Sequence, residues 1–209
     1  MILHARPLVA FALALSVTLS LAGCTGGAAI GSSYSLVRAR SVTVGDDSLA
    51  VTPPHEWNRS EQLLFDDVRW VEDWTLNGPI LDSISFVSGL PGGKTLVRQS
   101  RRDDRQVPAF RSDMTAPEIA SMIESLYRVR AGTVDFRTTS LAPRLFLGAN
   151  GFVLDYEHLD SDELRRRGRA VGAVVEGRLY LILLDAARSH YFDAALPDYE
   201  AIVASARRR

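Results

Sequence analysis

The alternation of apolar and polar residues is clearest near the C-terminal end of the chain, where two strand-like segments flank a short turn. Residues 169–175 and 178–184 are separated by Glu176 and Gly177, a pair typical of a two-residue β-hairpin turn. In residues 179–184 both alternating faces are apolar, which is typical of a strand covered on both sides. We therefore predict a hairpin whose second strand lies in the middle of a sheet, between two other layers.

Shorter segments rich in β-branched and aromatic residues predict further strands. They are separated by turn signals, of which Gly45-Asp46-Asp47 and Asn77-Gly78-Pro79 are the strongest. The predicted strands cover residues 42–44, 49–52, 68–76, 80–87, 94–99, 134–141 and 152–158. The polar segment 100–111 is expected to be an exposed loop.

Two other segments have helical periodicity. In the first, Thr115 is the expected N-cap, Pro117 lies in the first turn and Glu118 completes a capping box. This helix is expected to end near Gly132, and a second helix is expected over residues 197–206. The pattern as a whole predicts the α/β (α+β) class, with a central, mainly antiparallel sheet and helices packed on it.

The N-terminus has the three parts of an export signal. Arg6 supplies a positive charge, residues 8–21 form an uncharged apolar run, and small residues follow at Leu21-Ala22-Gly23-Cys24. The apolar run is shorter than the roughly 20 residues that a membrane-spanning helix needs. Leu-Ala-Gly-Cys resembles the lipobox of bacterial lipoproteins.

This resemblance implies a lipid modification at Cys24. Cys24 would carry a diacylglyceryl group, and signal peptidase would cut the chain between Gly23 and Cys24. The new amino group would then be acylated, for example with palmitate. Thr25 and Gly26 stand where an acidic residue would retain the protein in the inner membrane, so the outer membrane is the favoured location, with the protein facing the periplasm.

These features predict three parts in the chain. Residues 1–23 form the lipoprotein signal peptide, and residues 24–41 form the lipidated cysteine and a flexible tether, because residues 25–35 are rich in Gly, Ala and Ser. Residues 42–209 form a single globular domain of ordinary size.

Charge and cysteine content exclude several classes of function. Lys and Arg number 24 and Asp and Glu number 25, giving a net charge of −1, which is not the basic balance of a nucleic-acid-binding protein. Cys24 is the one cysteine of the chain. Because it is assigned to lipid, a disulfide network, a cysteine nucleophile and a cysteine-bound metal are excluded.

The predicted order of elements resembles the PsbP-like fold, over about residues 42–206. Residues 55–58, 74–79 and 151–157 are also similar to a group of proteobacterial lipoproteins. None of these stretches is a catalytic signature. The resemblance implies a PsbP-like sandwich that acts as a binding or assembly module, and fold by itself does not assign a function.

The segment from Gly89 to Thr95 ends like a phosphate-binding loop. The motif requires a first glycine where Ser88 stands, and it requires a helix after Thr95, whereas residues 95–97 are strand-like. We expect a glycine-rich connection and no nucleotide site.

An acidic run surrounds His158. Its oxygen ligands suit a divalent cation, but the spacing is not that of an EF-hand. A capped helix start explains the run better, with Asp160 as N-cap and Glu163 three residues later. We expect no bound metal and no cofactor. The carboxylates concerned are Asp155, Glu157, Asp160, Asp162 and Glu163.

His55, His158 and His190 are isolated in the sequence. A hydrolase would need His158 or His190 within hydrogen-bond reach of both an acid and a hydroxyl, and no G-x-S-x-G elbow is present.

Aromatic and basic clusters are expected to have ordinary structural roles. Among Trp57, Trp70 and Trp74, two are expected in the core. The basic pair at 101–102 and the tail at 207–209 are expected to be solvated rather than bound to lipid headgroups.

These observations favour a membrane-anchored periplasmic lipoprotein, a non-enzymatic binding or assembly module of the cell envelope. Its expected partners are the membrane, through the lipid, and an envelope protein. One alternative is a carrier or sensor of a small apolar ligand held between sheet and helix. The other is a hydrolase with an unrecognised site.

Overall fold

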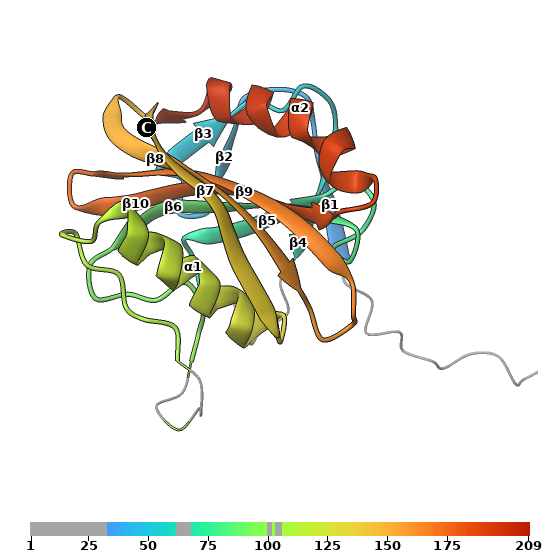
Figure 1. The fold of residues 1–209 in the computed structure, drawn as a ribbon. Coiled ribbons are helices and arrows are strands. Elements are labelled where there is room, and N and C mark those ends of the chain that lie inside the picture. The colour runs from blue at the N-terminus through green and yellow to red at the C-terminus, as the bar shows by residue number, and fades with distance from the viewer. Residues whose placement is uncertain (1–32, 62–67, 100–101, 103–105) are drawn as a thin grey trace, which may run out of the picture. The chain divides into compact units, whose positions relative to one another are not determined.

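The computed structural model describes residues 33–61, 68–99, 102 and 106–209 (Figure 1). The helices are α1 (Ala116–Arg130) and α2 (Tyr191–Ser205). The strands are β1 (Ser33–Val37), β2 (Val42–Val44), β3 (Leu49–Val51), β4 (Trp57–Glu61), β5 (Val71–Thr75), β6 (Asp82–Pro91), β7 (Asp135–Phe146), β8 (Ala149–Leu159), β9 (Arg165–Val175), β10 (Arg178–Ala187) and β11 (Arg207–Arg208).

Eight strands form one antiparallel sheet in the order β1-β4-β5-β6-β10-β9-β8-β7. A small second sheet has the order β11-β3-β2. Figure 1 shows α1 on one face of the large sheet, and α2 with the small sheet on the other. The predicted α/β (α+β) class, with a central antiparallel sheet and helices packed on it, is confirmed.

Each face of the large sheet has its own hydrophobic core. The core under α2 is built around Trp57, Trp74 and Phe192, and the core under α1 includes Ile119 and Met122. Strand β10 contributes to both, because its successive side chains point to opposite faces. The prediction of a central strand covered on both sides is therefore correct.

Local signals located two elements accurately. The hairpin β9–β10 turns at Glu176 and Gly177, whose φ angles are 51° and 75°, as a type I′ turn requires. Helix α1 begins at the predicted capping box of Thr115 and Glu118.

Four expectations are corrected by the structure. Residues 94–99 form no strand. Asp160 lies in the turn between β8 and β9 rather than at a helix N-terminus, because strand pairing extends from Arg165 onward. Helix α2 begins at Tyr191 and contains Pro197 in its interior.

The fourth correction concerns the tether. Ser33–Val37, inside the expected tether 24–41, pairs with β4, so the folded part begins before residue 42. The expected signal peptide, with Gly23 and Cys24, lies outside the described residues. No helix among the described residues is long and apolar enough to cross a membrane.

Candidate functional site

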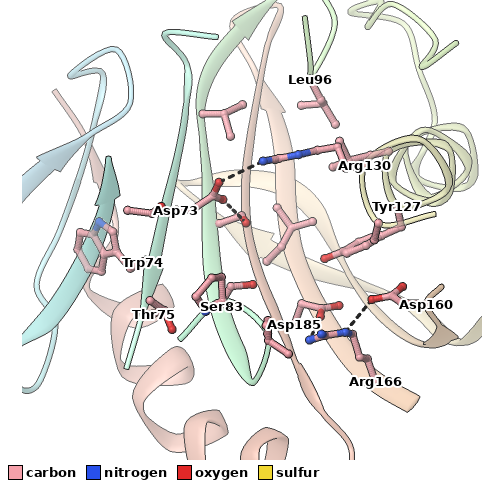
Figure 2. Close-up of a pocket in the computed structure, with 18 of the residues that line it drawn as sticks. Asp73, Trp74, Thr75, Ser83, Leu96, Tyr127, Arg130, Asp160, Arg166 and Asp185 are labelled. Carbon is pink, nitrogen blue, oxygen red and sulfur yellow. Dashed lines mark hydrogen bonds and ion pairs between the residues drawn. The ribbon is translucent and has the colours of Figure 1, made fainter. Parts of the chain in front are cut away.

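A cleft of about 440 Å³ lies between the C-terminal half of α1 and the large sheet (Figure 2). Its volume is within the roughly 300–1,000 Å³ of small-ligand sites. Apolar residues form most of its wall, and charged and hydroxyl groups gather within it. The apolar residues are Val71, Pro79, Ile80, Val87, Leu96, Leu126, Ala131 and Leu183; the polar ones include Asp73, Thr75, Ser83, Ser85, Arg130, Asp160, Arg166 and Asp185.

Strand register explains why polar groups meet in this cleft. Asp73 lies opposite Ser85 on the neighbouring strand, and Ser83 lies opposite Asp185. These residues alternate with core residues of the opposite face, such as Trp74 and Ile84. These four residues therefore form a polar region on the sheet surface that faces the C-terminal end of α1.

Asp82 shapes the loop that borders the cleft. Its buried carboxylate accepts hydrogen bonds from the Thr75 hydroxyl at 2.8 Å and the Leu76 N–H at 2.8 Å. It also accepts bonds from the backbone and side chain of Asn77. The turn signal in the sequence is thus held by one carboxylate, and it places Pro79 and Ile80 at the cleft.

A buried ionic cluster closes one end of the cleft. His158 Nδ1 lies 2.7 Å from Asp160 Oδ1, and His158 Nε2 lies 2.6 Å from Asp185 Oδ2. Arg166 lies between the same two carboxylates, 2.7 Å from Asp160 and 3.5 Å from Asp185. The hydroxyl of Thr133 donates to Asp160 at 2.7 Å. Every member of the cluster is buried.

The carboxylates hold His158 in its protonated form. Burial alone lowers its pKa, but the hydrogen bonds to Asp160 and Asp185 outweigh burial and raise the pKa to about 9. Burial raises the pKa of Asp160, but hydrogen bonds from His158 and Thr133 leave it below its usual value. At neutral pH the two carboxylates are therefore balanced by the imidazolium and the Arg166 guanidinium.

Aromatic rings pack against this cluster from the outer strands and from α1. The ring centroids of Tyr127 and His158 are 4.7 Å apart, and the Tyr127 and Tyr156 hydroxyls are 2.7 Å apart. Tyr156 leans across Gly168, where a Cβ atom would lie 2.0 Å from its ring. Gly168 is needed because only a residue without a side chain leaves room for the ring.

A second ion pair crosses the cleft from helix to sheet. Arg130, the last residue of α1, lies 3.7 Å from Asp73 on β5, and Figure 2 shows the two side chains reaching toward each other. The Ser85 hydroxyl also donates to Asp73. The Arg130 side chain is 35% exposed, so the pair remains open to solvent.

His158 lies near both acids and a hydroxyl, as a hydrolase would require, but its hydrogen bonds do not suit catalysis. His158 is within reach of two acids and lies 3.5 Å from the Thr133 hydroxyl. Both of its nitrogens are held by carboxylates, however, so no nitrogen remains to accept a proton from a hydroxyl. His55 bonds to Asp198 and is not part of the His158 cluster. His190 is the exposed residue directly before α2. This geometry does not form a catalytic triad.

The acidic run also separates into different environments. Asp155 pairs with Arg169 at 2.7 Å on the face toward α2, whereas His158 and Asp160 face α1. Among the described residues, no group of three His, Cys, Asp or Glu side chains is arranged to hold a metal ion. The glycine-rich segment after Gly89 leads into no helix.

The structure shows where the three tryptophans and part of the two basic clusters lie. Trp57 and Trp74 are buried core residues, as expected for two of the three, and Trp70 is half-buried. In the basic tail, Arg208 pairs with Glu176 at 2.8 Å. Arg101 of the other basic pair lies outside the described residues.

Sequence reasoning missed Asp73, Arg130 and Asp185 as site residues. One signal was available: Asp185 follows directly after the fully apolar run of β10, and an ionisable residue that continues a buried strand requires a partner.

Comparisons with known proteins agree with this architecture at the level of the fold. No protein-family model and no curated protein matches the sequence. The α+β arrangement, with a large antiparallel sheet between two helices, is that of the PsbP-like fold. The solution structure of cyanobacterial PsbP (CyanoP) from Synechocystis sp. PCC 6803 is similar with a TM-score of 0.55 and 18% identity, over 88% of this chain and 96% of that chain.

Two other solved structures are more distant. A protein from Bacteroides thetaiotaomicron VPI-5482 has a TM-score of 0.48 and 6% identity, over 83% of this chain and 49% of that chain. LpqN, described as involved in cell envelope biogenesis of Mycobacterium tuberculosis, has a TM-score of 0.33 and 11% identity, over 85% and 84% of the two chains. The TM-scores of these two structures are too low to support an argument. The similarity to CyanoP defines the fold only, so the function has to be argued from the site.

Proposed function

We propose that this chain is a membrane-anchored envelope lipoprotein that binds a small molecule, without catalysis, in the cleft between α1 and the large sheet. The observation that carries the proposal is the cleft itself, in which an apolar wall surrounds a few convergent polar groups. This combination is typical of small-molecule sites. The ligand we propose is not purely apolar, because charged and hydroxyl groups contribute to the lining.

Two further observations support the parts of this proposal. The lipobox-like sequence at Cys24 supports an envelope location, with the lipid in the outer membrane and the folded domain in the periplasm. The engagement of both His158 nitrogens supports binding rather than hydrolysis.

Native mass spectrometry of the protein purified from its own envelope tests ligand binding. We expect an adduct of defined mass on the wild-type protein. Ser83→Leu, which fills the cleft from its sheet side, should abolish the adduct, whereas Ser121→Leu on the exposed side of α1 should retain it. An unliganded wild-type protein, or equal adducts on both variants, would contradict the proposal.

A second candidate function is the docking of another envelope protein on strand β1. This edge strand presents Tyr34 and Leu36, which are 43% and 57% exposed, and it carries no charged residue. The other edge strand, β7, contains Asp135, two arginines and a proline, the residues with which proteins protect an edge from pairing. An unprotected edge suits the addition of a strand from a partner.

Crosslinking and pull-down from intact envelopes test this second function. One dominant envelope protein, lost in the unanchored Cys24→Ser variant and in Leu36→Lys, would support docking. Capture of that protein by Leu36→Lys as efficiently as by the wild type would exclude β1 as its binding site.

A further inference from the structure

The charged side chains that line the cleft are balanced when buried His158 is counted with them. Among the described residues, Asp73, Asp160 and Asp185 are each in an ion pair. The cations facing them are Arg130, Arg166 and protonated His158. Each carboxylate therefore has a compensating cation, and the cleft has no excess charge with which to attract a charged ligand.

Each ion pair also places a like charge next to the charge that would attract a charged ligand group. An ammonium group near Asp185 would lie close to Arg166 and His158, and a carboxylate near Arg130 would lie close to Asp73. In either case the repulsion offsets the attraction, while the charge loses its hydration on entering a mainly apolar cleft.

Hydrogen-bonding capacity nevertheless remains. The Arg130–Asp73 and Arg166–Asp185 separations of 3.7 and 3.5 Å exceed the length of a good hydrogen bond, about 2.7–3.2 Å. The N–H groups of Arg130 and Arg166 are thus not fully used by these pairs. A hydroxyl group is both donor and acceptor, so its oxygen is able to accept a hydrogen bond from either guanidinium without adding a charge.

The sheet side of the cleft adds a hydroxyl of its own. Ser83 lines the cleft and is half-buried, and within the described part of the chain no hydrogen bond is formed by its side chain. Val71, Leu96 and Leu126 line the same cleft. A ligand that fits therefore combines neutral hydroxyl groups with an apolar part.

From this we propose that the cleft binds an uncharged, hydroxyl-rich ligand with an apolar portion, of the glycoside class. The inference rests on the proposed function of the cleft as a small-molecule site. The same chemistry is found in a free glycoside and in the headgroup of a glycolipid, and the choice of probes separates the two.

Ligand-observed NMR titrations of the mature lipoprotein in nanodiscs, with empty nanodiscs as the reference, test the class. The soluble probes are methyl β-glucoside, glucosamine and glucuronate, which share a sugar ring and differ in charge. We expect both charged sugars to bind at least about tenfold more weakly than methyl β-glucoside. Equal or tighter binding of either charged sugar, or no binding of the neutral one at millimolar concentration, would overturn the proposal.

A second pair of probes tests the apolar portion and the source. Phenyl β-glucoside should bind more tightly than methyl β-glucoside if the apolar wall contacts the aglycone, as a glycolipid headgroup with the start of its lipid would. Equal affinities would favour a free sugar over a glycolipid and would overturn the apolar portion of the proposal, and tighter binding of the methyl compound would contradict the role of the apolar wall.

Two variants test the location and the charge argument. Ser83→Ala should weaken neutral glycoside binding about 2- to 10-fold, the loss of one neutral hydrogen bond, and the exposed Ser121→Ala should not. Arg130→Gln removes the positive charge that lies 3.7 Å from Asp73, so glucosamine should gain affinity relative to methyl β-glucoside. An unchanged ratio in Arg130→Gln would refute the charge-balance argument.

Failure of this inference is distinguishable from failure of the proposed function. If the envelope-purified protein carries an adduct that is charged or lacks hydroxyl groups, the glycoside class is wrong and the small-molecule site stands. If neither the adduct nor any glycoside is found, both are wrong.

Discussion

At the scale of single residues, the interior of this protein depends on a charged histidine. His158 lies between two buried carboxylates and is fully buried itself. Its pKa of about 9 in the folded chain is above its usual value of 6.5. Protonated His158 therefore stabilises the fold fully below about pH 6.5, and this stabilisation is lost as the pH rises through about 9.

This gives a pH-dependent prediction. Raising the pH from about 6 to about 9.5 should lower the free energy of unfolding by roughly 3 kcal/mol through His158. Urea unfolding at both pH values measures the change. His158→Gln should show a much smaller pH dependence, while the exposed His190→Gln should follow the wild type. Parallel pH profiles for wild type and His158→Gln would contradict the assignment.

Gly168 is a second residue on which the site depends. A methyl group at this position would overlap the ring of Tyr156 at 2.0 Å. We expect Gly168→Ala to destabilise the protein by about 1–3 kcal/mol, the usual range for overpacking. Chemical denaturation checks this, with Gly92→Ala as the control, because nothing lies within 4 Å of a Cβ atom at Gly92. Equal stabilities of the two variants would exclude the close contact.

At the scale of secondary structure, elements with strong local signals could be predicted from the sequence. Helix α1 has a capping box and the hairpin β9–β10 has a two-residue turn, and both signals act within a few residues. Strand β1 was missed because it is short and follows a Gly/Ser-rich segment. The helix expected at Asp160 was wrong because its carboxylate bonds to His158 and Thr133, which no local pattern reveals.

The candidate site was less predictable than its supporting elements. Asp73, Arg130 and Asp185 come from β5, α1 and β10, and only the strand register and the position of α1 bring them together. A single sequence contains the alternation of each strand but not the pairing between strands.

Pro197 supplies an element-scale prediction. The sequence pattern placed it at the start of the last helix, whereas it lies inside α2 and is exposed. It removes one N–H from the helical hydrogen bonds, at the carbonyl of Asp193. Pro197→Ala should therefore raise the free energy of unfolding, by about 1–3 kcal/mol.

Thermal unfolding followed by circular dichroism measures this effect. Pro54→Ala, an exposed substitution outside both helices, serves as the control and should leave the midpoint nearly unchanged. A midpoint for Pro197→Ala at or below that of the wild type would show that the proline fits this helix without loss.

At the scale of the whole molecule, the two faces of the sheet have different roles. The face under α2 is filled by Trp57, Trp74 and Phe192 and functions as a core. The face under α1 is filled at one end and leaves the cleft at the other. A PsbP-like sandwich of this kind provides a rigid sheet on one side of the cleft and a single helix on the other.

The location of the molecule is predicted by its first residues. Cys24→Ala should leave an uncleaved precursor that retains residues 1–23, because the lipobox-like sequence loses the residue that accepts lipid. Intact-mass measurement of the membrane fraction distinguishes this precursor from the mature lipoprotein, and Thr25→Ala should be processed normally. Normal processing of Cys24→Ala would exclude the lipid anchor.

The most direct test of ligand binding in the cleft is a crystal structure of the protein purified from its own envelope without added ligand. We predict electron density for a small molecule between α1 and the large sheet, in contact with Ser83 and near the Arg130–Asp73 pair. An empty cleft in a protein that carries an adduct by mass spectrometry would place the ligand elsewhere and would contradict the proposed site.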